Sequence, residues 1–273
     1  MTIGIFDSGL GGLTVAKEIM RVLPVQKIVY FGDTARAPYG GKSPQEVAKY
    51  ALENTQFLLK KKAKTIVIGC NTASAVAGEI LRKKFSDVPI LEVITPAVRE
   101  ALRLTRTGRV GVIGTRTTIQ SGAYQRWCSI YTRACPLFVP LVEAGHLDHP
   151  ATQNVAYRYL KPLKDARIDT LILGCTHYPF LKSVISRIMG SNVQLVDSAQ
   201  TVAKEVVAFI TPPTSPYLKG RSLVGSSLKL RGAGGVMKVP KHEFYVSQIT
   251  PKFRELAEKW LGQEIMLKIA KRV

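Results

Sequence analysis

Short, continuous runs of apolar residues alternate with amphipathic stretches along most of this chain. Continuous runs are typical of parallel strands covered on both faces, and the amphipathic stretches have the spacing of helices that pack on one side. The expected strands are residues 3–6, 27–31, 65–68, 90–94, 109–113, 137–142, 170–173, 193–196 and 244–246. The expected helices are residues 12–22, 43–62, 75–85, 96–104, 121–130, 151–163, 179–189 and 251–261, and another begins near Thr201. This alternation predicts a doubly wound α/β fold.

Two of the predicted strands end in nearly the same sequence. Residues 65–72 read Thr-Ile-Val-Ile-Gly-Cys-Asn-Thr, and residues 170–177 read Thr-Leu-Ile-Leu-Gly-Cys-Thr-His. Two further pairs align in the same order, 3–8 with 110–115 and, more loosely, 30–33 with 140–143. The offsets are about 105, 107 and 110 residues, and a repeat at one offset indicates two similar halves.

The repeat predicts two pseudo-symmetric α/β domains with mainly parallel sheets and a site in the cleft between them. The first domain is expected to be discontinuous, with residues 1–95 and 206–273, and the second to span residues 96–205. A Pro-rich stretch at 211–216 breaks the preceding helix. Residues 217–242 contain six Lys and Arg and no acid, so we expect a mobile or weakly ordered basic segment. Thr250 should cap the last helix, with Pro251 at its first position.

Composition narrows the class of protein. With 273 residues, 46% of them hydrophobic, the chain can bury one large core or two modest ones. Its four Cys residues form no CxxC pair and lack the spacing of the disulfide frameworks of secreted proteins. The N-terminal residues lack the basic region that begins a signal peptide. No apolar run reaches the length of a membrane span. These features predict a cytoplasmic protein with reduced thiols and no membrane partner.

The net charge of +20 permits contact with nucleic acid, acidic surfaces or anionic metabolites. A solvated basic surface explains the charge equally well. The basic clusters are not interleaved with aromatic residues, as a single-strand binding platform would be. Nucleic-acid binding by residues 217–242 therefore remains an open alternative.

Cys70 and Cys175 are the main candidates for chemistry, because each follows a buried strand and precedes a helix. Open α/β sheets bind ligands at this edge, and the N-terminus of a helix favours a thiolate. A buried structural Cys and a reversible disulfide are the alternatives. Cys175 and His177 lack the repeated spacing of a metal site, so no metal is expected.

Small polar residues surround the two thiols in the sequence. A ring of neutral donors would suit a carboxylate and an ammonium group, although each member could also be a helix cap. The ring consists of Ser8, Asn71, Thr72, Thr115, Thr118 and Thr176. The Gly-rich turn at 9–12 lacks a phosphate-loop ending and favours close backbone approach. The loop at 32–41 contains Pro38, Tyr39 and Gly40, whose backbone can face an anion.

Together these motifs resemble the glutamate racemases of the cofactor-independent aspartate/glutamate racemase superfamily. The matching pieces, in order, are Phe-Asp-Ser-Gly-Leu-Gly-Gly-Leu at 6–13, Gly-Asp-Thr-Ala-Arg-Ala-Pro-Tyr-Gly at 32–40, Gly-Cys-Asn-Thr-Ala-Ser at 69–74, Val-Ile-Gly-Thr at 112–115, Val-Glu-Ala-Gly at 142–145 and Gly-Cys-Thr-His-Tyr-Pro at 174–179. The resemblance covers residues 1 to about 210. It departs at 217–242, which is longer and more basic than the usual connection.

The resemblance implies that the protein interconverts L- and D-glutamate without a cofactor and supplies D-glutamate for peptidoglycan synthesis. It implies that Cys70 acts on the D enantiomer with Asp7 as helper, and Cys175 on the L enantiomer with His177 and Glu143. The ring of neutral donors would hold the α-carboxylate and amino group, and the loop with Asp33, Pro38, Tyr39 and Gly40 the side-chain carboxylate. A homodimer is also compatible with the resemblance.

Overall fold

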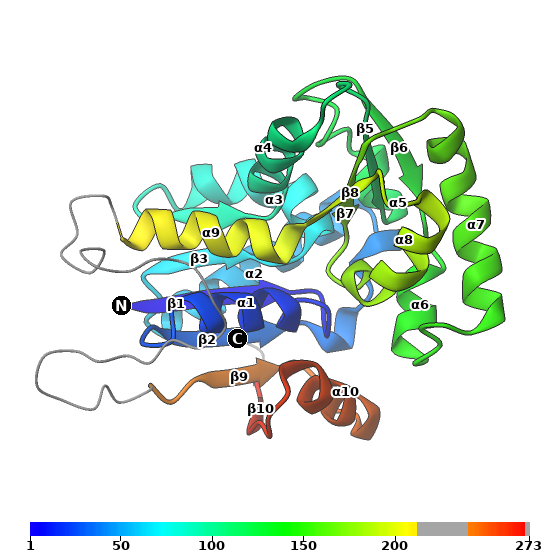
Figure 1. The fold of residues 1–273 in the computed structure, drawn as a ribbon. Coiled ribbons are helices and arrows are strands. Elements are labelled where there is room, and N and C mark those ends of the chain that lie inside the picture. The colour runs from blue at the N-terminus through cyan, green and yellow to red at the C-terminus, as the bar shows by residue number, and fades with distance from the viewer. Residues whose placement is uncertain (212–239, 271–273) are drawn as a thin grey trace, which may run out of the picture.

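Figure 1 shows the computed structural model of the protein, which describes residues 1–211 and 240–270. Within these residues the strands form two sheets, and every strand pair is parallel. The six-stranded sheet has the order β10 (Leu267–Ile269), β9 (Glu243–Val246), β2 (Lys27–Gly32), β1 (Thr2–Asp7), β3 (Thr65–Ile68) and β4 (Ile90–Glu92). The four-stranded sheet has the order β6 (Ile130–Ala134), β5 (Val110–Gly114), β7 (Thr170–Gly174) and β8 (Gln194–Asp197).

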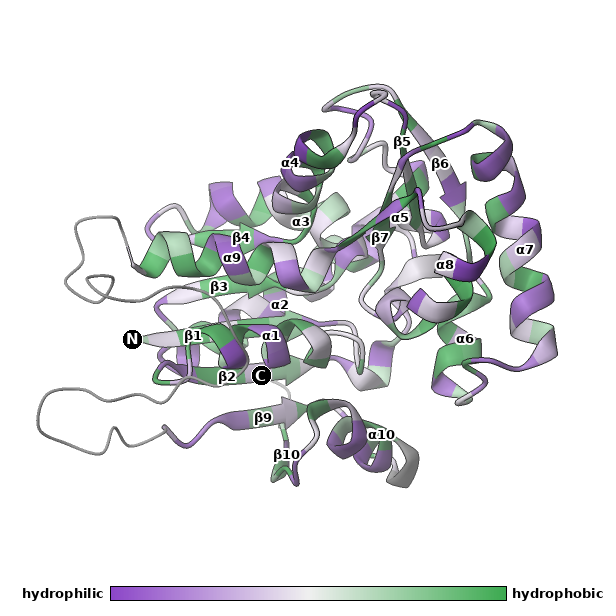
Figure 2. Ribbon diagram, in the orientation of Figure 1, coloured by the Kyte–Doolittle hydropathy of each residue, from purple (hydrophilic) through white to green (hydrophobic). Residues whose placement is uncertain are grey.

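Helices cover both sheets, as the continuous apolar strands require. The helices are α1 (Leu13–Val22), α2 (Pro44–Lys60), α3 (Asn71–Lys84), α4 (Ile94–Leu104), α5 (Arg116–Gln120), α6 (Phe138–Glu143), α7 (Pro150–Asp165), α8 (Lys182–Met189), α9 (Ser198–Ile210) and α10 (Pro251–Leu261). Short 3-10 helices are η1 (Thr34–Arg36), η2 (Tyr39–Gly41) and η3 (Tyr178–Leu181). In Figure 2 strands such as β3 and β4 are largely hydrophobic, whereas the edge strand β6 and helices such as α4 and α7 carry hydrophilic residues as well.

The central strands of the first sheet divide their side chains between two cores. Ile3 and Ile5 of β1 pack in the same core as helix α1, whereas Phe6 packs with α2 and α3 on the opposite face. Strand β2 alternates in the same way, with Tyr30 on the α1 side and Phe31 on the α2 side. Both faces of these strands are therefore apolar, and this explains the continuous hydrophobic runs in the sequence.

The expected fold of two similar α/β halves is confirmed. The order β2-β1-β3-β4 in the first sheet matches β6-β5-β7-β8 in the second, strand for strand in chain order. Strands β9 and β10 extend the first sheet beyond β2, so the end of the described chain returns to the first half (Figure 1). Helix α9 packs against α1 and α4 and so links the two halves.

The second half differs from the sequence prediction over residues 116–142. The short helix α5 was not expected, and residues 121–127 form turns, so the expected helix 121–130 is wrong. The expected strand 137–142 is instead helix α6. The strand that corresponds to β2 is β6, which begins at the last residue of the expected helix 121–130. Consequently the loose alignment of residues 30–33 with 140–143 is wrong. Pro140 lacks the N–H that a central strand needs, and the buried positions Phe138, Val139 and Val142 have helical spacing. Strand β6 lies at an edge with only Ile130 buried, which explains its weak hydrophobic signal.

The described end of the chain contains the expected strand and helix, β9 and α10, and also strand β10, which the sequence did not predict. Thr250 caps helix α10 by accepting a hydrogen bond from the Phe253 N–H, Pro251 follows at the first helical position, and Gly262 ends the helix with a left-handed φ of 75°. The basic segment 217–242 lies outside the described residues except for its last three, 240–242. Among the described helices none is long and apolar enough to cross a membrane.

Candidate active site

The carboxyl ends of four strands bring the predicted site residues together. Cys70 follows β3 and is the N-cap residue of α3, and Cys175 follows β7 directly before η3. Asp7 ends β1, and Thr115 follows β5 as the N-cap of α5. Because the matching strands of the two halves end at one cleft, one thiol from each half reaches it.

A small cavity of about 20 Å³ lies between the two thiols. It is lined by Ser8, Pro38, Tyr39, Gly40, Cys70, Asn71, Thr72, Thr115, Val139, Cys175, Thr176 and His177. All of these except Val139 are residues that the sequence singled out. Val139 lies on α6, and the sequence missed it because that segment was expected to be a strand.

Three threonine hydroxyls join the halves at the edge of the cavity. Thr72 Oγ1 lies 3.0 Å from both Thr115 Oγ1 and Thr118 Oγ1, and the last two are 2.8 Å apart. Thr72 comes from the first half, and Thr115 and Thr118 come from the second. These hydroxyls form a compact group of neutral donors, which can bind a carboxylate without a bulky counter-ion.

The Cys70 thiol is buried and lies 3.7 Å from the Ser8 hydroxyl. Burial, followed by the nearby charge of Asp7, raises the pKa of Cys70 to about 12, although the Ala73 N–H at the start of α3 works in the opposite direction. The helix N-terminus therefore lowers the pKa of Cys70, as expected, but this effect is smaller than the increase caused by burial of the thiol away from water. The raised pKa favours the neutral form of the Cys70 thiol, contrary to the expectation of a favoured thiolate.

The Cys175 thiol has a different helper. Its Sγ is 3.9 Å from His177 Nδ1, and His177 Nε2 is 3.0 Å from Glu143 Oε1. Burial raises the pKa of Cys175 well above its ordinary value, and the charges of Cys70, Asp7 and Glu143 raise it further. Since ionisation of one thiol disfavours ionisation of the other, the pair holds one negative charge more readily than two.

Asp7 lies under the cleft and does not line the cavity. Its Oδ2 accepts a 2.8 Å hydrogen bond from the Gly9 N–H, and its buried Oδ1 has no partner among the described residues. Burial raises the pKa of Asp7, and the Gly9 N–H and His177 oppose that shift. A carboxylate with a raised pKa is a stronger base than an exposed one, and it can exchange a proton with a neighbouring thiol.

Asp33 does not line the cavity either. Both of its carboxylate oxygens accept hydrogen bonds from residues of the 32–41 loop or from a residue packed against that loop. Oδ2 accepts hydrogen bonds from the Tyr39 hydroxyl and from Arg36 Nε, and Oδ1 accepts one from the Ser247 hydroxyl. Asn54 Nδ2 donates to the Tyr39 oxygen over 3.1 Å. The carboxylate thus holds the loop that carries Tyr39 and Gly40. Sequence reasoning missed Arg36, Asn54 and Ser247, and only the Asp-x-x-Arg spacing hinted at one of them.

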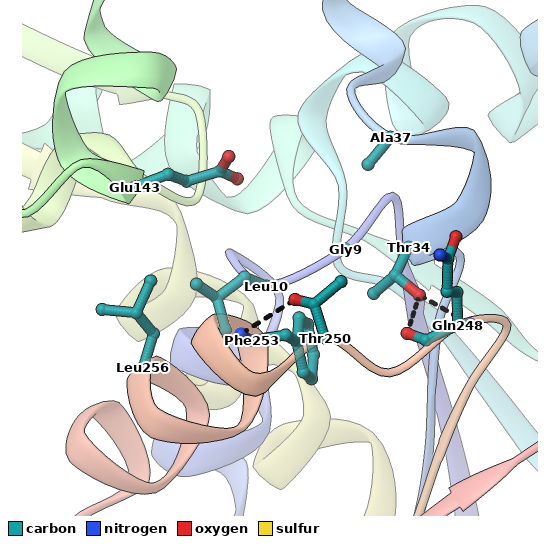
Figure 3. Close-up of a pocket in the computed structure, with 9 residues that line it drawn as sticks. All are labelled: Gly9, Leu10, Thr34, Ala37, Glu143, Gln248, Thr250, Phe253 and Leu256. Carbon is teal, nitrogen blue, oxygen red and sulfur yellow. Dashed lines mark hydrogen bonds between the residues drawn. The ribbon is translucent and has the colours of Figure 1, made fainter.

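A larger cavity of about 220 Å³ opens beside the cleft. Figure 3 shows its lining residues, with the Glu143 carboxylate directed into the space between α6 and Ala37. Gly9 and Ala37 line this cavity, and their chain neighbours Ser8 and Pro38 line the smaller one. The C-terminal elements supply the opposite wall through Phe253 and Leu256 (Figure 3). The two cavities are therefore adjacent, and Glu143 stands between solvent and His177.

The thiols also give a test of these electrostatics. Because the pKa of Cys70 is about 12 in the folded state and about 8.5 in an unfolded chain, folding retains a proton that the unfolded chain releases. The stabilisation is complete below about pH 8.5 and is lost as the pH rises toward 12, by about 1.4 kcal/mol per pH unit. Urea unfolding between pH 8 and 10.5 should therefore show a shallower loss of stability for Cys70→Ser than for the wild type. Parallel losses would contradict the assignment, and Cys128→Ser is the matched control.

Metal chemistry has no obvious site in the described part of the chain, where no three His, Cys, Asp or Glu side chains gather as ligands. The Cys residues at 70, 128, 135 and 175 are all free thiols. The cleft therefore offers two thiols, two carboxylates, an imidazole and a set of hydroxyl and amide groups. Such a set can remove and return protons on opposite sides of one small, charged molecule.

Comparisons with known proteins agree with this chemistry. The family model described as Asp/Glu/hydantoin racemase matches residues 13–206. The glutamate racemase of Geobacter metallireducens is 46% identical over 270 residues, which covers 96% of this chain and 93% of that protein. Among solved structures, the glutamate racemase isoform RacE1 of Bacillus anthracis has a TM-score of 0.85 at 36% identity, covering 99% of this chain and 97% of that one. The Francisella tularensis glutamate racemase in complex with D-glutamate has a TM-score of 0.84 at 36% identity, with coverages of 99% and 97%.

Proposed function

The chain belongs to the Asp/Glu/hydantoin racemase family, and we propose that it is a glutamate racemase that supplies D-glutamate for peptidoglycan synthesis. One observation carries this function: two buried thiols from related strand ends reach one cleft, and each has its own proton-exchanging helper. Inversion of a carbon needs a base on one face and an acid on the other. A pair of like groups can exchange these roles, because both enantiomers are substrates.

In the proposed reaction the thiolate of Cys175 removes the α-proton of L-glutamate, and the thiol of Cys70 gives a proton to the opposite face. Cys175 ends protonated and Cys70 ends as the thiolate, so the proton count is conserved and the next D-glutamate can react in reverse. A charge on Cys70 raises the pKa of Cys175, which supports a pair in which only one of the two thiols is ionised at a time. Asp7 exchanges protons with Cys70, and His177, held by Glu143, does so with Cys175.

The substrate needs groups that stabilise negative charge at the α-carbon, since the proposed reaction uses no cofactor as an electron sink. The hydroxyls of Ser8, Thr72, Thr115 and Thr118, with Thr176, bind the α-carboxylate, where charge accumulates when the proton leaves. The Pro38–Gly40 loop receives the side-chain carboxylate, and Asp33 acts through Tyr39 as the residue that holds this loop. Asn71 contacts the amino group.

The proposal divides the chain into a discontinuous first domain, residues 1–95 and 206–273, and a second domain, residues 96–205. The pairing of β9 with β2 supports the discontinuity. The free thiols suit a reducing cytoplasm, where we place the protein.

Circular dichroism of L- and D-glutamate solutions tests the function directly. The purified protein should remove the optical signal of either enantiomer without an added cofactor, and in heavy water the α-position should gain deuterium. L- and D-aspartate serve as controls and should racemise far more slowly. An unchanged glutamate signal would refute the proposal, and equal rates for aspartate would refute the substrate assignment.

A further inference from the structure

The side chain of Asn71, at the start of α3, is held by the opposite half of the molecule. Its Nδ2 donates a 2.9 Å hydrogen bond to the Tyr124 hydroxyl oxygen and a 3.3 Å hydrogen bond to Ser198 Oγ. Tyr124 follows α5, and Ser198 is the first residue of α9. Asn71 is 2% exposed and Ser198 is 2% exposed, so water does not compete for these contacts.

The hydroxyl of Ser198 determines which way the Asn71 amide is turned. A serine hydroxyl has one proton, and Ser198 donates it to the Leu173 carbonyl over 3.0 Å. Ser198 Oγ can therefore only accept from Asn71, and the group that faces it must be the NH₂. A flipped amide would place two acceptors against each other. The hydrogen-bond network thus fixes the orientation of the Asn71 amide.

This orientation leaves Asn71 Oδ1 as a buried acceptor with no partner among the described residues. Asn71 also lines the cleft between the thiols. A buried carbonyl without a donor is costly, which indicates that a ligand supplies one. At neutral pH both carboxylates of glutamate only accept hydrogen bonds, and its ammonium group is its only donor.

We propose that Ser198 and Tyr124 are positioning residues that hold the Asn71 amide with Oδ1 toward the α-ammonium of the substrate. The inference rests on the proposed racemase function and adds two residues to it that do not line the cavity between the thiols. Both residues lie in the second half, whereas Asn71 lies in the first. The acceptor is therefore oriented for the ammonium when the two halves are closed on each other.

The test compares two ligands that differ only at the amino group, D-glutamate and glutarate. Ser198→Ala removes the acceptor that faces Nδ2, so the amide can turn and present NH₂ to the ammonium. A hydrogen bond to a charged group contributes about 1.5–3 kcal/mol, so we expect the affinity for glutamate to fall at least tenfold. The inhibition constant of glutarate should change by less than about threefold. Tyr124→Phe should act in the same direction.

Thr201→Val is the matched control, because Thr201 is a buried residue of the same helix turn, and its hydroxyl donates to the backbone carbonyls of Asp197 and Ser198. It should leave the ratio of the glutamate and glutarate constants unchanged, and thermal unfolding should show that all variants fold. Equal losses for both ligands in Ser198→Ala and Tyr124→Phe would show a purely structural role and overturn the inference, as would unchanged constants. If the wild type neither racemises nor binds glutamate, the proposed function fails, which is distinct from a loss confined to the variants.

Discussion

Replacing either Cys70 or Cys175 with serine is expected to lower the racemisation of glutamate by about 10³-fold, within the range that positioned acid–base groups contribute. The serine hydroxyl has nearly the size of the thiol, but its pKa is far too high for it to remove an α-proton. Because each thiol serves one face, neither can compensate for the other. Circular dichroism of both enantiomers measures the loss. Cys128→Ser, away from the cavity-lining residues, should retain wild-type activity.

The assignment of each thiol to one enantiomer needs a different measurement. L- and D-glutamate have equal free energy, so kcat/KM must be the same in both directions for every variant. Deuterium exchange without inversion avoids this constraint. Cys175→Ser should still exchange the α-proton of D-glutamate through Cys70, and Cys70→Ser should exchange that of L-glutamate. Racemisation at the wild-type rate by both serine variants would refute the two-thiol mechanism, and exchange of the opposite enantiomers would reverse the assignment.

Gly11→Ala is expected to lower kcat/KM by about 10²-fold, the effect of displacing a reacting group by roughly 1 Å. A Cβ at Gly11 would lie 2.1 Å from Thr176 Oγ1 and 2.6 Å from His177 Nδ1. Thr176 and His177 belong to the second half, so the added methyl would push the helper of Cys175 away or hold the cleft open. Initial rates with both enantiomers, together with the Tm, separate loss of activity from loss of folding.

Gly41→Ala is the matched control for this prediction. A Cβ at Gly41 meets nothing within 4 Å, and the residue ends η2, directly after the Pro38–Gly40 loop. The substitution should leave kcat/KM close to that of the wild type. If Gly11→Ala were as active as Gly41→Ala, the close approach of the glycine turn to His177 would have no catalytic importance.

The local sequence predicted the secondary structure well where buried apolar residues follow one another along a strand or recur along one face of a helix. The alternation of strands and helices followed from continuous apolar runs, which both cores of the first sheet require. The prediction failed at residues 130–142. Strand β6 lies at an edge and is mostly polar, whereas the short helix α6 is a continuous apolar run that contains a proline, so each has the hydrophobic pattern expected of the other type of element. The same error hid Val139, which lines the cavity.

The roles of polar side chains depended more on their surroundings. Asp33 follows a strand end, as a ligand-binding residue would, yet its oxygens are taken by Tyr39, Arg36 and Ser247. Ser247 lies more than 200 positions away in the chain and returns through the pairing of β9 with β2. No local pattern can indicate such a partner, since strand pairing brings it there.

The sequence by itself determined the parallel α/β class, the repeated halves and the placing of Cys70 and Cys175 at matching strand ends. These follow from hydrophobic periodicity and from motifs, which are properties of consecutive residues. Only the tertiary structure decided the ionisation of the thiols and the orientation of the groups around them. Burial raises the pKa of Cys70 against the effect of the helix N-terminus, and Ser198 turns the amide of Asn71 from the opposite half. Desolvation and hydrogen-bond direction depend on what packs around a group, and here the surroundings come from distant parts of the chain.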